Sequence, residues 1–166
     1  FLSLWKLGDR GLRLTLKSPT GSGKTIMMAQ FLRDIISDPR FTNTDCAFFW
    51  ITNSDNLAMQ SKEKLLGYYG GASEISLLDL NDINEGMMPR NSVFFINWQK
   101  LVSKAQGNRK LRTEGEQGFT FDTFLKNTHS VKREVVLIID EEHIASGTVL
   151  ANELIHSVIN PRIIIG

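Results

Sequence analysis

The sequence predicts an α/β fold in which helices cover both faces of a mainly parallel β-sheet. Runs of apolar, often β-branched residues alternate along the chain with segments whose apolar residues recur at helical spacing. Residues 135–139 are the clearest strand, because an unbroken apolar run suits a central parallel strand with both faces covered. Parallel strands joined by helices are therefore the expected architecture, and no internal repeat interrupts it.

The first expected element is a short helix or an irregular entry over residues 1–10. Leucines alternate with polar residues from Leu12 to Leu16, which predicts a strand that leads into a glycine-rich loop. A pattern of apolar residues at helical spacing follows this loop. The Asp38-Pro39 pair is expected to end that helix.

The remaining expected elements, in chain order, are a polar loop at 41–45, a strand at 47–51, a helix at 55–66 with Ser54 or Asp55 as N-cap, a glycine-rich break at 67–73, a strand at 75–80, a loop at 82–91, a strand at 92–96, a short helix through Val102, a helix from Phe121, the strand at 135–139, a helix at 148–159 and a strand at 162–165. Residues 106–118 are polar and punctuated by glycine, which indicates either a mobile insertion or a surface hairpin.

Residues 18–25 read Ser-Pro-Thr-Gly-Ser-Gly-Lys-Thr, which is typical of a loop that binds phosphate. Glycine permits positive φ and a close approach of backbone to phosphate, and the N-terminus of the following helix favours an anion. The lysine of such a loop contacts the β- and γ-phosphates, and the hydroxyl after it binds magnesium. The general pattern begins with glycine, where this chain has Ser18, and the alternative is a simple glycine-rich turn. The predicted nucleotide-binding residues are Thr20, Gly21, Ser22, Gly23, Lys24 and Thr25.

Acidic residues directly follow the apolar run at residues 135–139. Ligands of open α/β sheets bind at the carboxyl ends of the strands, so Asp140 and Glu141 are expected to emerge there. A solvated acid at a strand end is the alternative, and a phosphate loop upstream argues against it. Together the two stretches predict a nucleotide–magnesium site.

Composition narrows the class of protein. The formal net charge of +1 argues neither for nor against nucleic acid. A single cysteine, Cys46, excludes an internal disulfide framework and a multi-cysteine zinc site, and we expect it to pack as a small apolar residue. The absence of a signal segment and of a run long enough to span a membrane favours a cytoplasmic protein without a membrane partner. Because the chain begins at Phe1, we expect it to be part of a longer protein.

The order of these motifs resembles that of superfamily 2 helicases. Residues 18–25 resemble their motif I, of the form Ala-x-x-Gly-x-Gly-Lys-Thr, and residues 140–143 resemble motif II in its DExH form. Residues 49–52, with Gln60 downstream, resemble the motif Ia region. The Asn97-Trp98 segment is most similar to the restriction subunits of type III restriction enzymes. The resemblance implies that residues 1–166 are the first RecA-like, ATP-binding lobe, without motif III and without the second lobe.

That resemblance implies ATP binding and hydrolysis coupled to DNA translocation or unwinding, with Mg²⁺ as cofactor. It makes Lys24 and Glu141 catalytic, since Glu141 would orient or deprotonate the attacking water. Thr25 and Asp140 would hold the magnesium ion, and His143 would couple the nucleotide to the nucleic acid. The implied partners are DNA or RNA, a second helicase lobe that supplies arginine fingers, and a modification methyltransferase subunit. Without the second lobe we expect the chain alone to be a weak ATPase.

Nucleic-acid contacts have two sources of support. Residues 100–112 carry five lysines and arginines and no acid, which suits phosphate binding, although a solvated loop is the alternative. Trp98 could stack on a base or belong to the core, and His129 and His156 are expected to be structural or surface residues. The resemblance implies that Thr52, Ser54, Gln60 and Asn97 lie near the nucleic-acid backbone, and the basic run adds Lys100. The predicted nucleic-acid-binding residues are therefore Thr52, Ser54, Gln60, Asn97 and Lys100.

Two other functions remain open at this point. One is a P-loop ATPase that acts on a partner other than nucleic acid. The other is a non-catalytic nucleotide-binding module.

Overall fold

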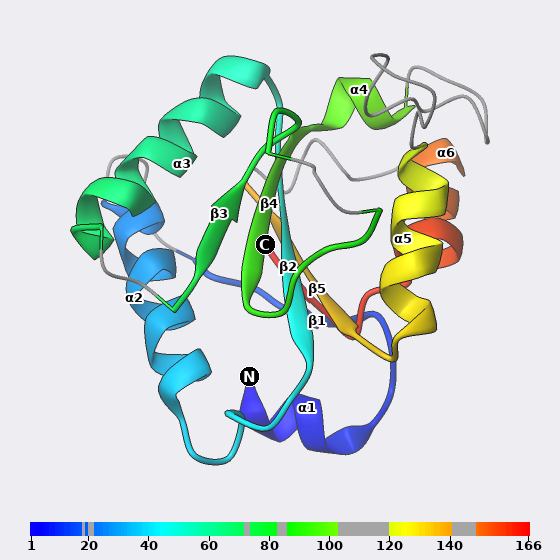
Figure 1. Ribbon diagram of the computed structural model, residues 1–166, viewed down its shortest axis with the longest axis horizontal. Coiled ribbons are helices and arrows are strands. Elements are labelled where there is room, and N and C mark those ends of the chain that lie inside the picture. The colour runs from blue at the N-terminus through cyan, green and yellow to red at the C-terminus, as the bar shows by residue number, and fades with distance from the viewer. Residues whose placement is uncertain (18, 20–21, 72–73, 83–85, 103–119, 141–148) are drawn as a thin grey trace.

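The computed structural model describes residues 1–17, 19, 22–71, 74–82, 86–102, 120–140 and 149–166. In these residues six strands form one sheet in the order β1-β6-β5-β2-β4-β3, and every neighbouring pair is parallel (Figure 1). The strands are β1 (Leu12–Leu14), β2 (Cys46–Thr52), β3 (Ser76–Leu78), β4 (Ser92–Asn97), β5 (Glu134–Ile139) and β6 (Ile163–Ile165). The predicted α/β fold with a mainly parallel sheet is confirmed.

Helices cover both faces of the sheet, as predicted (Figure 1). Residues of α1, α2 and α3 pack in one apolar cluster, and residues of α4, α5, α6 and the π-helical segment η2 pack in the other. The helices are α1 (Leu2–Leu7), α2 (Lys24–Ser37), α3 (Asp55–Tyr69), α4 (Trp98–Val102), α5 (Phe121–Ser130), α6 (Val149–Glu153) and η2 (Leu154–Ile159).

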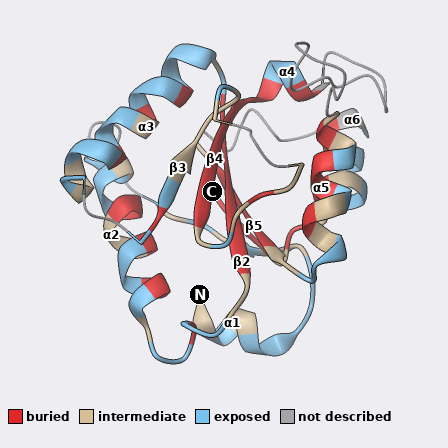
Figure 2. Ribbon diagram, in the orientation of Figure 1, coloured by how far each residue is buried: buried red, intermediate tan, exposed pale blue. Residues whose placement is uncertain are grey.

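Strands β2 and β4 are buried along their whole length because each has a helical layer on both sides (Figure 2). Alternate residues of β2 serve the two layers: Phe48 and Trp50 pack with α2, while Phe49 and Ile51 pack with α5. Cys46 is buried at the start of β2, and burial raises the pKa of its thiol. It packs as a small apolar residue, as expected.

Local signals set the helix starts. The Ser54 hydroxyl accepts a hydrogen bond from the Leu57 N–H at 3.3 Å and caps α3. Gly23 precedes α2 with φ 83°, a conformation that favours glycine. Its carbonyl accepts from the Ile26 N–H at 2.9 Å, so the helix begins at Lys24.

Three boundaries differ from the sequence-based expectation. The break predicted to start at Gly67 starts at Gly70, because α3 continues to Tyr69, whose hydroxyl donates to the Ala29 carbonyl at 2.9 Å. Strand β3 is shorter than residues 75–80, since Asp79 turns away to bind Lys62. The helix predicted at 148–159 is divided between α6 and η2 where it is described.

Further observations concern the ends and the loops. Leu16 lies outside β1, although its N–H donates to the Gly166 carbonyl at 2.6 Å and extends the pairing with β6. The segment predicted as an insertion or hairpin, residues 106–118, lies outside the described residues. None of the described helices is long and apolar enough to cross a bilayer.

Candidate nucleotide site

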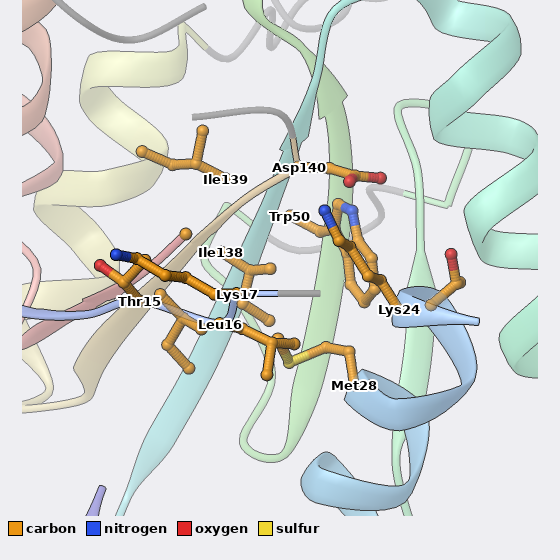
Figure 3. A pocket seen from close by; sticks show the side chains of 12 residues that line it. Thr15, Leu16, Lys17, Lys24, Met28, Trp50, Ile138, Ile139 and Asp140 are labelled. Carbon is orange, nitrogen blue, oxygen red and sulfur yellow. The ribbon is translucent and has the colours of Figure 1, made fainter. Parts of the chain in front are cut away.

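A pocket of about 400 Å³ opens at the carboxyl ends of the strands, where the sequence predicted the site (Figure 3). Its wall comes from the exits of β1, β5 and β6, from the first turns of α2 and from β2. The lining residues are Thr15, Leu16, Lys17, Lys24, Thr25, Met28, Trp50, Ile138, Ile139, Asp140, Ile165 and Gly166.

The cationic wall is built by the start of α2. Lys24 is the first residue of the helix and Thr25 the second, and both line the pocket. The N-terminus of a helix leaves backbone N–H groups without intrahelical acceptors and carries a partial positive charge. A lysine ammonium at the same place adds a full charge, so this wall suits an anion.

The acidic wall is the residue that follows β5. The Asp140 N–H donates to the Ile51 carbonyl at 3.0 Å, so the pairing of β5 with β2 continues one residue beyond the strand. That bond holds the backbone from which the carboxylate turns toward the pocket (Figure 3). Because side chains alternate along a strand, Asp140 shares the α2 side of the sheet with Ile138.

The floor at β1 and β6 is held by backbone pairing. The Gly166 N–H donates to the Leu14 carbonyl at 3.0 Å, and the Leu16 N–H donates to the Gly166 carbonyl. This exchange fixes Thr15 and Lys17 beside the pocket. Lys17 is a second cationic residue of the lining, and the sequence analysis did not single it out.

An apolar pocket of about 290 Å³ adjoins this site and shares four of its residues. It lies between β1 and α2, and it differs from the first pocket because none of the described residues that line it is charged. Its lining is Leu14, Thr15, Leu16, Met27, Met28, Phe31 and Ile165.

The structure thus brings together three residues from the two predicted halves of the site: Lys24, Thr25 and Asp140. Hydroxyl and carboxylate oxygens are ligands that Mg²⁺ accepts, and Mg²⁺ commonly keeps water and phosphate oxygens as its other ligands. Thr25 and Asp140 therefore fit a magnesium ion chemically. Ser22 and Gly23 are described but do not line the pocket. The remaining predicted residues lie outside the described part of the chain: Thr20, Gly21, Glu141, Glu142 and His143.

The residues predicted to bind nucleic acid fall into two groups. Thr52 and Asn97 are buried at the ends of β2 and β4, and both bond within the chain. The Thr52 hydroxyl donates to the Ser54 carbonyl at 2.8 Å, and the Asn97 side-chain oxygen accepts from the Gln99 N–H at 2.8 Å. As placed, these two side chains support the strand ends, and binding of nucleic acid by them stays a prediction.

Gln60 and Lys100 form the exposed group, with Ser54 half-buried as the cap of α3. The Lys100 ammonium lies 3.0 Å from the Asp55 carboxylate, and both side chains are largely exposed. A contact of these residues with nucleic acid also stays a prediction. The other basic residues of the predicted cluster, from Lys104 to Arg112, lie outside the described residues.

Three further side chains, those of Trp98, His129 and His156, contact other parts of the fold. Trp98 is buried in the cluster on the α5 side of the sheet, which favours the core interpretation over base stacking. The His129 Nε2 lies 2.9 Å from the Ile159 carbonyl, and the His156 ring lies close to Gly11. His129 is half-buried and His156 is exposed, which agrees with the expectation that they are structural or surface residues.

A comparison with known families agrees with this arrangement. A family model described as "Type III restriction enzyme, res subunit" matches residues 3–166, which is nearly the whole chain. No curated protein matched the chain.

Proposed function

The chain belongs to the family of the type III restriction enzyme res subunit, a family of helicase-like ATPase domains, and on that premise we propose that its pocket binds ATP with Mg²⁺ and hydrolyses it. The observation that carries the proposal is the pocket lined by both Lys24 and Asp140. Phosphoryl transfer depends mainly on positioning and on neutralising charge, and this pocket offers groups for both.

Each residue of the site has a proposed role. Lys24 binds oxygens of the β- and γ-phosphates, while Thr25 and Asp140 hold the magnesium ion, Asp140 through water. The metal, when bound, neutralises charge on the phosphates. Glu141 follows Asp140 in the sequence and is proposed to orient or deprotonate the attacking water. His143 is proposed to couple the nucleotide to the nucleic acid.

The loop before α2 completes the phosphate site in this proposal. Backbone N–H groups in a glycine-containing loop can approach phosphate closely, and Gly23 has the positive φ that such loops use. The proposed backbone contacts come from Thr20, Gly21, Ser22 and Gly23.

We propose that the nucleotide base lies against the adjoining apolar pocket. Ligand sites are mostly apolar with a few placed polar groups, and here the apolar part borders the charged part directly. A base against Met28 and Phe31 would bury its faces on hydrocarbon, with the phosphates directed toward Lys24.

The proposed partner is DNA. RNA is the alternative partner and would bind through the same residues. Lys100 is exposed near the carboxyl end of β4, and the basic residues that follow it in the sequence would add phosphate contacts. Gln60 and Ser54 lie on α3 and at its cap, near the same end of the sheet. Thr52 and Asn97 would hold the ends of β2 and β4 in place beneath them.

We further propose that residues 1–166 act as the first lobe of a two-lobed motor. The second lobe would supply the cationic group that a nucleotide on one lobe lacks at the γ-phosphate. A modification methyltransferase subunit is the proposed partner of the whole restriction system.

Phosphate release with and without duplex DNA tests this function, in the protein that joins the domain to its second lobe. DNA-stimulated release that Lys24→Ala abolishes is the expected result. Release that neither DNA nor RNA stimulates would instead favour a P-loop ATPase that acts on another partner. Nucleotide binding without hydrolysis would favour a non-catalytic module.

A further inference from the structure

Trp50 carries a polar atom that has no hydrogen-bond partner among the described residues. The side chain is 2% exposed, and its indole N–H is buried without a hydrogen-bond partner in the part of the chain that the structure describes. Buried polar groups in folded proteins nearly always have a partner, so each exception calls for an explanation. Among the buried unpartnered side-chain atoms of the described residues, the Trp50 nitrogen alone belongs to a residue that lines the nucleotide pocket.

The ring has little freedom to find a partner elsewhere. In the sheet Trp50 lies opposite Ile138 on one side and Phe95 on the other. It stacks on the Phe95 ring with a centroid distance of 5.5 Å and an interplanar angle of 29°. Helix α2 covers the same face. These contacts fix the indole against the pocket wall.

Packing alone does not require the nitrogen. The strand residues of this apolar cluster beside Trp50 are hydrocarbon, such as Phe48, Val136 and Ile138. An indole N–H can only donate, so the group that satisfies it must be an acceptor. The pocket has a carboxylate, Asp140, and a cationic wall at Lys24 that suits phosphate (Figure 3). Both acceptors are anionic oxygens.

We infer that Trp50 is a positioning residue of the nucleotide site, whose indole N–H donates to an anionic oxygen when the pocket is occupied. The oxygen belongs either to a phosphate of the nucleotide or to the Asp140 carboxylate. In the first case Trp50 orients the phosphates, and in the second it orients a ligand of the magnesium ion. This inference rests on the proposed function, because it takes the pocket to be the nucleotide site.

The indole resonances give a readout that packing would not move. The chain has three tryptophans, and the ¹⁵N-labelled chain should therefore give three indole N–H signals. Trp5→Phe and Trp98→Phe assign the signals of those residues and leave Trp50 by elimination. On saturation with magnesium and a non-hydrolysable ATP analogue, the Trp50 signal should move downfield and its exchange with solvent should slow.

The other two tryptophans are internal controls. The Trp5 carbonyl accepts from Arg162, which precedes β6, and so Trp5 lies at the amino end of the sheet, away from the pocket. Trp98 is buried in the opposite layer. Their signals should stay in place when the analogue binds.

Affinity tests the same inference through a substitution. Trp50→Phe keeps an aromatic ring on Phe95 but removes the N–H donor. It should weaken binding of the analogue about 10- to 100-fold, the range for a hydrogen bond to a charged group. Trp98→Phe is the matched control, since it removes the same atoms from a buried site that does not line the pocket, and it should bind like wild type.

Two further arms separate the two acceptors. If the acceptor is phosphate, Trp50→Phe should weaken binding equally in an Asp140→Ala background and without magnesium. If the acceptor is the Asp140 carboxylate, the effect of Trp50→Phe should disappear in the Asp140→Ala background, because alanine leaves no side-chain acceptor. Either pattern supports a positioning role for the indole.

The inference is overturned if the wild-type chain binds the analogue while the Trp50 signal stays in place, whether or not Trp50→Phe folds. Equal affinities of wild type and Trp50→Phe would overturn it too. These results leave the proposed function intact. A wild-type chain that binds no nucleotide at all would instead defeat the proposed function, and the inference with it.

Discussion

Lys24 and Asp140 line the same pocket, although one begins α2 and the other follows β5. The parallel sheet explains this, because it brings the exits of β1, β5 and β6 to one edge. The wall with Lys24 and the wall with Asp140 therefore line the same pocket (Figure 3). This pairing is the basis for the predictions about nucleotide chemistry.

Lys24→Ala should weaken nucleotide binding about 10- to 100-fold, because it removes a charged donor to the phosphates. The fold should persist, since Lys24 is exposed at the helix start and belongs to neither apolar cluster. Calorimetric titration with the magnesium complex of ATP measures the affinity, and thermal unfolding checks the fold. Lys64→Ala, at an exposed position on α3, is the control that should bind like wild type. Unchanged affinity in Lys24→Ala would contradict the assigned role.

Glu141→Gln should bind ATP with near wild-type affinity and hydrolyse it about 10²–10⁴-fold more slowly. Glutamine keeps the shape and the hydrogen bonding of the side chain but cannot accept the proton. Asp140→Asn should differ from Glu141→Gln, because it removes a charged ligand of the magnesium ion. The affinity of Asp140→Asn for ATP should therefore depend less on magnesium than that of wild type. Single-turnover hydrolysis together with binding separates the two variants. Normal turnover in Glu141→Gln would show that another group orients the water.

Lys100→Ala should reduce the salt dependence of DNA binding, because one phosphate contact fewer lowers the slope of log affinity against log salt by about 0.9. Stability should change by less than about 1 kcal/mol, since the exposed pair with Asp55 contributes little. Lys126→Ala, exposed on α5 and outside the predicted basic cluster, is the control. Fluorescence anisotropy over a salt series measures the slopes, and identical slopes for Lys100→Ala and wild type would remove Lys100 from the interface.

Lys62→Met should destabilise the fold by about 1–2 kcal/mol, because it leaves two carboxylates without their cation. The Lys62 ammonium lies 2.6 Å from an Asp79 oxygen and 2.5 Å from an Asp82 oxygen. Burial opposes the charged form of Lys62, but these two hydrogen bonds outweigh it and raise its pKa. For Asp79, burial is likewise outweighed by the bond from Lys62, and its pKa is lowered.

The directions of the pKa shifts of Asp79 and Lys62 determine how the loss of stability in Lys62→Met depends on pH. The lowered pKa of Asp79 gives stability that is complete above the unfolded-state pKa of about 3.9 and is lost as the pH falls through the folded pKa. The raised pKa of Lys62 gives stability that is complete below about pH 10.4 and is lost as the pH rises through the folded pKa. The difference in unfolding free energy between wild type and Lys62→Met should therefore be constant at neutral pH and shrink in acid. Urea unfolding from pH 3 to 7, with Lys64→Met as control, measures it; a difference that does not depend on pH would contradict the role of the cluster.

The sequence predicted the sheet best where strands are buried on both faces. Strands β2, β4 and β5 are mostly apolar runs, which suit parallel strands covered by helices on both faces. Lys24 and Asp140 were found because their neighbours along the chain form recognisable motifs. The end of α3 was missed, since Gly67 is tolerated there while Tyr69 is anchored by a distant carbonyl.

Some residues have roles that no motif or spacing in their own stretch of sequence indicates, so these roles were not predicted. Trp50 reads as a packing residue in an apolar strand, and only its burial beside the pocket shows an unsatisfied N–H. The Lys62 cluster depends on residues that follow another strand. Such features arise from contacts between elements, which periodicity and spacing along the chain do not encode.

A crystal structure of the chain with Mn²⁺ and a non-hydrolysable ATP analogue tests whether the pocket beside Lys24 and Asp140 is the nucleotide site. Mn²⁺ occupies oxygen sites that suit Mg²⁺, and its anomalous signal locates it without ambiguity. We expect phosphate oxygens within about 3.2 Å of the Lys24 ammonium. We also expect the metal beside Thr25, with Asp140 bound to it directly or through one water. An analogue bound elsewhere, or a metal remote from Asp140, would contradict the assignment of this pocket as the nucleotide site.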